Sequence, residues 1–326
     1  RYGERTRKME AVLGIDVGGT SIKAGLFTPE GELLEERKIP TPALVDDAAY
    51  AAVTDGLKRI LDAHDATPED VIACGLDIPG PVADDGTVGF LPNIKLDPEG
   101  LVGAISSVFP RAQIAFVNDA NAAALGEMWA GVAHGTSSYV LIALGTGVGA
   151  GIIVDGKIWS GAHGAASELG HLIIEVDGIP CTCGKCGCTE RYCSATAIIR
   201  MAKEACALHP DCAILKAVNG DVDKITAKTV FDLAKEGDDI ASRVFRRYVK
   251  YLTIAINNVV SFLDPDMIVL GGGVSRAGDF LLDAVRELLP KYLMYPVLPM
   301  PEIALAQLGN DAGIIGAAML GRQEEV

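Results

Sequence analysis

Residues 11–27 read AVLGIDVGGTSIKAGLF, and a related stretch, YVLIALGTGVGAGIIVDGKIW, follows at residues 139–159. Each stretch has an apolar segment, a turn rich in glycine and threonine, and a second apolar segment. The first is followed by PEGE at residues 29–32, whose Pro and Gly favour another turn before LLEERKIP. The second contains the turn dipeptide Asp-Gly before its last strand. Each stretch therefore predicts three antiparallel strands, and the repetition predicts a duplicated unit.

The rest of the chain alternates between helical and strand patterns. A chain of 326 residues is long enough for two packed domains. The alternation predicts an α/β fold of two related halves, each a βββαβα unit, with a cleft between them. The last helix, after residue 309, is free to pack back on the first half. We expect a smaller N-terminal domain of residues 9–118 plus 310–326 and a larger domain of residues 119–309, which carries the metal loop and a dimer surface.

Composition limits the classes of partner. The formal net charge is -15, with 49% hydrophobic and 22% charged residues, which is typical of a globular protein. Because no basic patch offsets this charge, nucleic acid is not an expected partner. Apolar runs stay well below the roughly 18 residues of a membrane span, so no membrane contact is expected. The basic residues 1–8 lack the apolar run of a signal peptide, which favours a cytoplasmic protein.

Glycine-rich turns provide the first chemical indication. Glycine allows backbone amides to approach phosphate oxygens, so both repeated turns are candidates for binding ATP. Such a turn alone usually only reverses the chain, but two in a duplicated unit strengthen the interpretation. Neither turn has the Walker or dinucleotide-binding spacing. A third cluster after MIVL leaves room for adenine, although a simple strand-to-helix turn explains it as well. Candidate nucleotide-binding residues are Gly18, Gly19, Thr20, Lys23, Gly145, Thr146, Gly147, Gly149, Gly271, Gly272 and Gly273, with Asp16 placed to hold water on Mg²⁺.

Asn118 and Asp119 end an apolar strand and precede the helix-forming segment ANAAALGE. Phosphoryl transfer to an alcohol needs a group that positions the hydroxyl and accepts its proton, and a carboxylate is the common choice. Asp119 is therefore the candidate general base. Asn118 offers both a donor and an acceptor to a neighbouring sugar hydroxyl. An Asn-Asp pair is also a common helix cap, and capping and catalysis can coexist at one corner.

The segment from Glu168 to Glu190 is dense in metal-binding side chains. It contains His171 and then CTCGKCGCTE, with four cysteines at positions 181, 183, 186 and 188. These cysteines are too closely spaced to pair comfortably as disulfides, whereas thiolates with a histidine favour a closed tetrahedral zinc site. Five ligands compete for four positions, so spacing does not identify the spare cysteine, and a site of cysteines alone is also possible. Zinc would fix Glu168 and Glu190 to accept hydrogen bonds from sugar hydroxyls, and His171 has one ring nitrogen for zinc and one for sugar.

Together these motifs resemble the ROK family (repressors, open reading frames and kinases) of the actin-like ATPase superfamily. The matching segments are DVGGTSIKAG, LDIPGPV, VNDANAAALGE, LGTGVGAGII, ELGH with CTCGKCGCTE, and PDMIVLGGGVS. The resemblance covers nearly the whole chain after Met9. It implies two actin-like (ribonuclease H-like) domains, magnesium ATP in the cleft, and a homodimer or dimer of dimers.

The resemblance also implies residue roles. The family pattern ExGH followed by CxCGxxGCxE selects His171, Cys181, Cys183 and Cys188 as zinc ligands and leaves Cys186 at a variable position. The implied substrate-binding residues are Asn118, Asp119, Glu168, His171 and Glu190, with Asp119 as the base, and Gly80 of LDIPGPV is expected beside the substrate.

Substrate choice rests on weaker features. The length, TERYCSATAI at 189–198 and FDLAKEGD at 231–238 are similar to bacterial glucokinases of this family, which implies ATP-dependent phosphorylation of glucose at O6. Kinases for N-acetylmannosamine, fructose or allose share the same sugar-contacting residue types, and one or two hydrogen bonds distinguish such sugars. The family also contains sugar-responsive repressors. The intact base and phosphate turns favour a kinase over a non-catalytic sensor.

Overall fold

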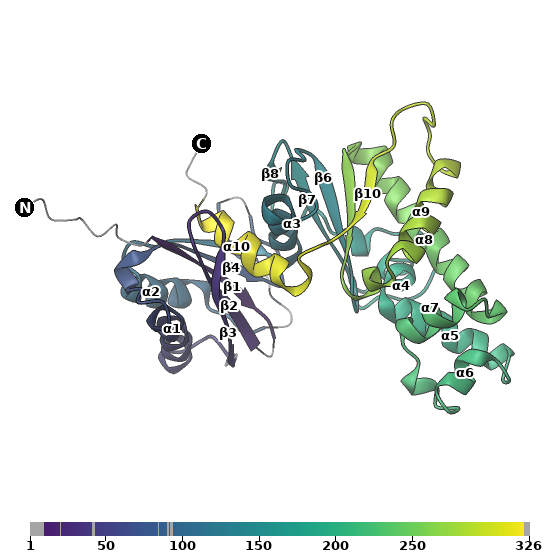
Figure 1. Cartoon of the computed structure of the whole chain (residues 1–326), viewed down its shortest axis with the longest axis horizontal. Coiled ribbons are helices and arrows are strands. Elements are labelled where there is room, and N and C mark those ends of the chain that lie inside the picture. The colour runs from purple at the N-terminus through teal and green to yellow at the C-terminus, as the bar shows by residue number, and fades with distance from the viewer. Residues whose placement is uncertain are drawn as a thin grey trace, which may run out of the picture. The chain divides into compact units, whose positions relative to one another are not determined.

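Two units, each built around its own sheet, make up the described part of the chain (Figure 1). The computed structural model describes residues 10–19, 21–40, 43–83, 85–89, 91 and 94–322. Unit 1 comprises the described residues up to Gly135, together with Ile158–Ala166 and the described residues from Asn310. Unit 2 comprises Thr136–Lys157 and Ser167–Gly309.

The sheet of unit 1 has five strands in the order β3-β2-β1-β4-β5. The first three strands form antiparallel pairs, and β4 and β5 continue the sheet in parallel with β1. The strands are β1 (Ala11–Val17), β2 (Ser21–Phe27), β3 (Leu33–Pro40), β4 (Val71–Ile78) and β5 (Gln113–Asn118). The three antiparallel strands predicted from the first glycine turn are therefore confirmed.

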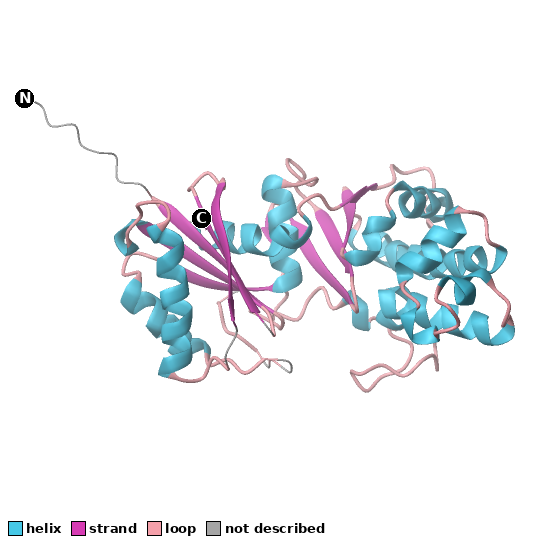
Figure 2. Ribbon diagram, turned by 60° about the horizontal axis from the view of Figure 1, so that its bottom comes forward, coloured by secondary structure: helices cyan, strands magenta, loops and turns pink. Residues whose placement is uncertain are grey.

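The helices of unit 1 pack around this sheet. Figures 1 and 2 show α1 (Asp47–Asp62) and α2 (Pro98–Val108) side by side, and their apolar side chains share one core with Leu13 and Ile15 of β1. Asp46 caps α1 by accepting a hydrogen bond from the Ala49 amide at 2.9 Å. The remaining elements are η1 (Pro68–Asp70), α3 (Asp119–Ala130) and α10 (Ala312–Arg322), and η6 (Gly309–Asp311) begins at the last residue of unit 2 and continues into unit 1.

Helix α10 lies directly on the sheet because glycines remove the intervening side chains. A Cβ added at Gly14 would lie 2.0 Å from the carbonyl oxygen of Ile314, and one at Gly75 would lie 1.8 Å from that of Ala317. A Cβ at Gly316 would lie 1.8 Å from the carbonyl oxygen of Ala122 in α3. Because α3 packs on α10 in this way, residues up to 135 belong to unit 1, whereas the larger domain expected from the sequence begins at residue 119.

The sheet of unit 2 repeats the topology of unit 1. Its order is β10-β9-β6-β7-β8, with β6 antiparallel to β7 and parallel to β9. Read from β8, this order matches the order read from β3 in unit 1. The strands are β6 (Tyr139–Leu144), β7 (Val148–Val154), β8 (Lys157–Ile158), β9 (Met267–Gly271) and β10 (Glu302–Leu305). The predicted α/β fold and its duplicated unit are confirmed.

The helices of unit 2 form a larger layer beside this sheet. The longest, α8, buries Val244, Tyr248, Leu252 and Ile256, which are spaced to lie on one face. The hydroxyl of Tyr248 donates to the carbonyl of Cys193 at 2.9 Å, which satisfies a fully buried polar atom. None of the helices in the described ranges is both long and apolar enough to cross a bilayer. The helices are η2 (Leu169–His171), α4 (Glu190–Cys193), α5 (Ala195–Leu208), α6 (Ala213–Ala217), η3 (Val222–Lys224), α7 (Ala227–Lys235), α8 (Asp239–Leu263), η4 (Gly273–Ala277), α9 (Asp279–Leu288) and η5 (Leu289–Lys291).

Candidate functional site

Asn118 and Asp119 form the corner between β5 and α3, and the predicted helix cap is present there. The Asn118 side-chain oxygen caps α3 by accepting hydrogen bonds from the amides of Ala120 at 3.0 Å and Asn121 at 3.2 Å. Its side-chain nitrogen donates to the carbonyl of Gly80 at 3.1 Å. Two capping bonds occupy the oxygen, so the second N–H is the group that Asn118 retains for a ligand. Gly80 therefore helps to orient Asn118.

Asp119 is the first residue of α3 and its side chain is exposed. Its Oδ1 atom accepts a hydrogen bond from the Ala120 amide at 2.8 Å. The start of a helix favours a negative charge, because its free amides carry partial positive charge. The corner thus holds an accessible carboxylate in a fixed position, as a general base requires.

The predicted phosphate turn of unit 1 connects β1 to β2. Gly18 donates its amide hydrogen to the carbonyl of Ser21 at 3.2 Å, and a Cβ at Gly18 would lie 2.9 Å from that same oxygen. Gly19 is exposed at the turn. Thr20, the next predicted nucleotide-binding residue, lies outside the described residues. The turn itself is therefore a tight reversal that needs glycine at position 18.

Lys23 lies on β2 directly opposite Asp16 on β1. Its ammonium forms ion pairs with Asp311 and, at 3.1 Å, with Glu36. Burial alone would lower the pKa of Lys23, but hydrogen bonds to Asp311 and Glu36 raise it overall. The ammonium is therefore already held by two carboxylates, and a phosphate would have to compete with them.

Asp77 is a buried acid beside Asp16 that was not among the residues predicted from the sequence. It is 1% exposed on β4 and lies opposite Asp16 in the parallel β1–β4 register. A side-chain hydrogen bond joins the two carboxyl groups. Burial raises the pKa of Asp77 well above its ordinary value, and the charges of Asp16 and Asp119 raise it further. Burial also raises the pKa of Asp16, while the hydrogen bond from Asp77 and the charge of Lys23 oppose that shift.

In unit 2, the second glycine turn, between β6 and β7, packs against the first residues of α5. The amide of Gly145 donates to the carbonyl of Gly147 at 3.0 Å, which closes the turn. The amide of Ala195 donates to the Gly145 carbonyl at 2.8 Å, and the Thr196 hydroxyl donates to the carbonyl of exposed Thr146 at 2.9 Å. Contacts with α5 therefore fix the turn. Gly149 lies outside it, within β7 opposite Ala143.

The third glycine cluster follows β9. Gly272 has a positive φ of 80°, and a Cβ there would lie 2.5 Å from the carbonyl oxygen of Leu144. Gly271 ends β9, and Gly273 begins η4 with no atom within 4 Å of an added Cβ. Gly272 is thus required by the strand-to-helix turn itself. Gly273 leaves the open space that a flat ring needs.

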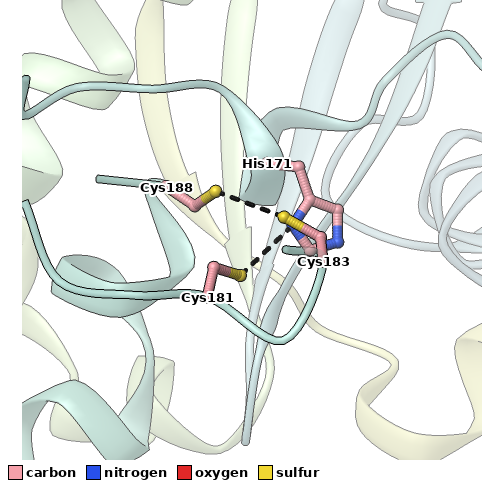
Figure 3. Close-up of side chains that lie close together, drawn as sticks. All are labelled: His171, Cys181, Cys183 and Cys188. Carbon is pink, nitrogen blue, oxygen red and sulfur yellow. Dashed lines mark hydrogen bonds between the residues drawn. The ribbon is translucent and has the colours of Figure 1, made fainter. Parts of the chain in front are cut away.

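Four side chains of the cysteine-rich segment converge on one point (Figure 3). They are His171, Cys181, Cys183 and Cys188, whose ligand atoms all lie within 4.8 Å of one another. Cys181 Sγ is 3.7 Å from His171 Nδ1, and Cys183 Sγ is 3.6 Å from Cys188 Sγ. Ligand atoms around a tetrahedral zinc lie about 3.5–3.8 Å apart, given Zn–S distances of about 2.3 Å. The donor set and its spacing therefore fit zinc. Cys186 is exposed and is not part of the group.

Backbone hydrogen bonds shape the loop that carries these ligands. The Cys181 amide donates to the carbonyl of Lys185 at 2.8 Å, which closes a turn with Gly184 at a positive φ of 85°. Gly187 also has positive φ, and a Cβ there would lie 1.8 Å from the Glu175 carbonyl oxygen. Glycine is thus needed at both positions to bring the cysteines together. Burial raises the pKa of the Cys188 thiol to about 12, so the loop without metal holds a neutral thiol there.

Glu190 connects this cluster to the glycine turn within unit 2. Its Oε1 atom is 3.6 Å from Cys181 Sγ, and its Oε2 atom accepts a hydrogen bond from the Val148 amide at 3.4 Å. A Cβ at Gly147 would lie 2.2 Å from Oε2, so the glycine makes room for the carboxylate. Glu168 precedes η2 and is exposed. The Glu190 side chain thus contacts the cluster, whereas Glu168 meets it through its backbone carbonyl, which accepts a hydrogen bond from the His171 amide at 3.0 Å.

Comparison with known proteins shows similarity along almost the whole chain. A sequence model of the ROK family matches residues 12–324. A glucokinase of Halalkalibacterium halodurans is 39% identical over 319 residues, which cover 96% of this chain and 95% of that protein. A glucokinase of Streptomyces coelicolor is 35% identical, with 97% of this chain and 99% of that protein covered.

A solved structure shows the same relationship in three dimensions. It is that of a ROK family glucokinase from Streptomyces griseus in complex with glucose and AMPPNP. The TM-score is 0.78 at 35% identity, with 96% of this chain and 100% of that chain covered. Since the family match spans nearly every residue of both sheets, the chain belongs to the ROK family.

Proposed function

We propose that the protein is a glucokinase, which transfers the γ-phosphoryl group of ATP to O6 of glucose to give glucose 6-phosphate. The observation that carries this proposal is the position of Glu190 against both the four-residue cluster and the glycine turn of unit 2. A sugar-binding carboxylate beside a phosphate turn is the arrangement that such a transfer needs. The full-length similarity to glucokinases supports glucose as the substrate.

The proposed sugar ligands are Asn118, Asp119, Glu168, His171 and Glu190. Asp119 accepts the proton of the O6 hydroxyl as that oxygen attacks the γ-phosphorus. Asn118 donates its remaining N–H to a neighbouring hydroxyl, because its oxygen is occupied by the α3 cap. The glutamates accept hydrogen bonds from further hydroxyls, and a sugar that lacks one of these hydroxyls would leave a carboxylate unpaired.

For the nucleotide, we propose that amides of the two glycine turns bind the phosphates of ATP. Magnesium, when bound with ATP, supplies positive charge that offsets the phosphate charge during transfer. Asp16 would hold one of its waters. Gly273, with open space beside it, is the proposed position for adenine.

We propose a structural role for zinc in the cluster of His171, Cys181, Cys183 and Cys188. The metal would order the loop that carries Cys181, whose Sγ lies 3.6 Å from Glu190 Oε1, and the ordered loop would limit where the Glu190 carboxylate can lie. Elemental analysis of the purified protein is expected to give about one zinc per chain. A fully active, stable protein without metal would contradict this role.

The reaction is tested by a coupled assay with Asp119→Asn as the variant. Removal of a general base lowers kcat by about 10²- to 10⁴-fold, whereas glucose binding, measured by calorimetry without nucleotide, is expected to stay within a few fold. Asparagine has nearly the same size, so the variant separates proton transfer from packing. Near wild-type turnover of Asp119→Asn would refute the base assignment.

The same assay with a panel of sugars and donors tests specificity. The panel should contain glucose, fructose, allose, mannose, N-acetylglucosamine and N-acetylmannosamine, each with ATP, ADP or polyphosphate. The highest kcat/KM is expected for glucose with ATP. A preference for N-acetylmannosamine or fructose would replace the proposed substrate, and sugar binding without turnover would favour a sensor.

We also propose a cytoplasmic protein that assembles as a homodimer or dimer of dimers. Exposed apolar side chains between η5 and β10 support association with a second copy, since Met294, Tyr295 and Val297 are 74%, 62% and 89% exposed. Sedimentation velocity measures the assembly directly. A monomer at micromolar concentration would contradict it.

A further inference from the structure

Asp77 is an acidic residue in an otherwise apolar strand. Strand β4 reads VIACGLDI, and its residues from Ala73 to Ile78 are all buried. Asp77 itself is 1% exposed. A carboxyl group removed from water in this way is costly unless it stays neutral or finds partners. Its presence therefore needs a physical explanation.

The surroundings of Asp77 contain other acids. Asp16 lies opposite it on β1, and the charges that act on Asp77 are those of Asp16 and Asp119. The cation nearest in the register, Lys23, faces Asp16 and is paired with Glu36 and Asp311. On the side of α10, a Cβ at Gly313 would lie 3.0 Å from the Oδ2 atom of Asp77. Among the described residues, this Oδ2 atom has no hydrogen-bond partner.

Two adjacent carboxyl groups of unequal burial share protons unequally. The fully buried group retains its proton, because a second negative charge beside the first is unfavourable in a site that excludes water. Asp16 is only partly buried and lies near the charge of Lys23, so it is the group that ionises. The neutral acid then serves as a hydrogen-bond donor to the carboxylate, and such a charge-assisted bond is short and directional.

We propose that Asp77 is a positioning residue, whose neutral side chain donates a hydrogen bond that holds the Asp16 carboxylate in the orientation needed to bind a water of magnesium. The inference rests on the proposed role of Asp16 in binding magnesium ATP. It predicts that position 77 needs a donor and does not need a negative charge. Asparagine meets that requirement at nearly the same size, whereas alanine does not.

The test compares Asp77→Asn with Asp77→Ala in the full-length protein. Calorimetry gives the Kd of AMPPNP in the presence of Mg²⁺ and, separately, in the presence of EDTA. With Mg²⁺, Asp77→Asn is expected to stay within about threefold of the wild type, and Asp77→Ala to bind about 10-fold more weakly or worse. With EDTA, all three proteins are expected to bind equally. A purely structural role for Asp77 would weaken binding in both conditions.

The binding results that would contradict the inference distinguish a failure at Asp77 from a failure at Asp16. Equal losses in Asp77→Asn and Asp77→Ala would show that the charge matters and would overturn the inference, as would wild-type binding by Asp77→Ala. If Asp77→Ala does not fold, loss of Mg²⁺-dependent binding by folded Asp77→Asn still overturns it. If the wild type itself binds AMPPNP no better with Mg²⁺ than with EDTA, the proposed role of Asp16 fails first.

Discussion

Substitution of Gly147 by alanine tests the link between the glycine turn and Glu190. The new Cβ would lie 2.2 Å from Oε2 and 3.3 Å from Cδ of Glu190, closer than these atoms can approach. The end of a glutamate side chain is flexible, so it can move without a large change in the free energy of unfolding. The movement removes the 3.4 Å hydrogen bond from the Val148 amide and shifts the carboxylate away from the position proposed for binding a sugar hydroxyl.

The expected magnitude follows from the loss of one hydrogen bond, which a glucose hydroxyl would donate to the charged Glu190 carboxylate. Such a bond contributes about 1.5–3 kcal/mol, which corresponds to about a 10- to 100-fold increase in the Kd for glucose. Calorimetry without nucleotide isolates this effect from phosphate binding. The matched variant is Gly145→Ala in the same turn, where an added Cβ meets no atom within 4 Å. Its glucose affinity is expected to stay within about twofold of the wild type.

A double-mutant cycle identifies the cause. In a Glu190→Ala background the carboxylate is absent, so the added Gly147→Ala substitution should have little further effect on glucose binding. Wild-type glucose affinity in Gly147→Ala would refute the reasoning. An equal effect in the Glu190→Ala background would show that the loss arises elsewhere in the turn.

Three further predictions address the metal, the fold and the buried acid. Cys183→Ser is expected to lose most of its zinc and to unfold at a lower temperature, whereas Cys186→Ser should retain about one zinc per chain; equal zinc contents would contradict the ligand set. Gly316→Ala places a Cβ 1.8 Å from the carbonyl oxygen of Ala122 and should cost about 3 kcal/mol in urea unfolding, and an unchanged midpoint would be inconsistent with this packing. The folded-state pKa of Asp77 is raised well above its ordinary value of 3.8, so the free energy of unfolding of the wild type falls relative to that of Asp77→Asn as pH rises above about 4. Asp77→Asn should therefore be more stable than the wild type at pH 7, and this difference in stability should disappear toward pH 4. A difference in stability that does not depend on pH would count against this assignment.

The fold could be predicted because its decisive signals are local. The two glycine turns lie between apolar strands, and each is followed by another turn within about a dozen residues. Repetition of this local pattern gave the duplicated topology that the two sheets show. The domain boundary was harder to predict from the sequence. It depends on the packing of α3 against α10 through Gly316, a contact between segments that are distant in sequence.

The convergence of His171, Cys181, Cys183 and Cys188 was equally local, since all four residues lie within positions 171–188. By contrast, Lys23 meets Asp311, which is 288 residues away, and no sequence pattern indicates that pairing. Asp77 is the single acidic residue of the otherwise apolar segment VIACGLDI. An acid within an apolar strand is the sequence signal that could have identified it. Its partnership with Asp16 required the strand register, which pairs them across β1 and β4.

The contacts within unit 2 form a chain from the four-residue cluster to the glycine turn. His171 contacts Cys181, Cys181 contacts one oxygen of Glu190, and the other oxygen of Glu190 contacts the amide next to Gly147. Because Glu190 contacts both the cluster and the turn, a displacement of the cluster is expected to reach the turn through Glu190. Loss of zinc should then weaken sugar binding before it unfolds the sheet, because the strands of unit 2 are held by their own hydrogen bonds. The proposed zinc therefore acts on the substrate through the position of one carboxylate.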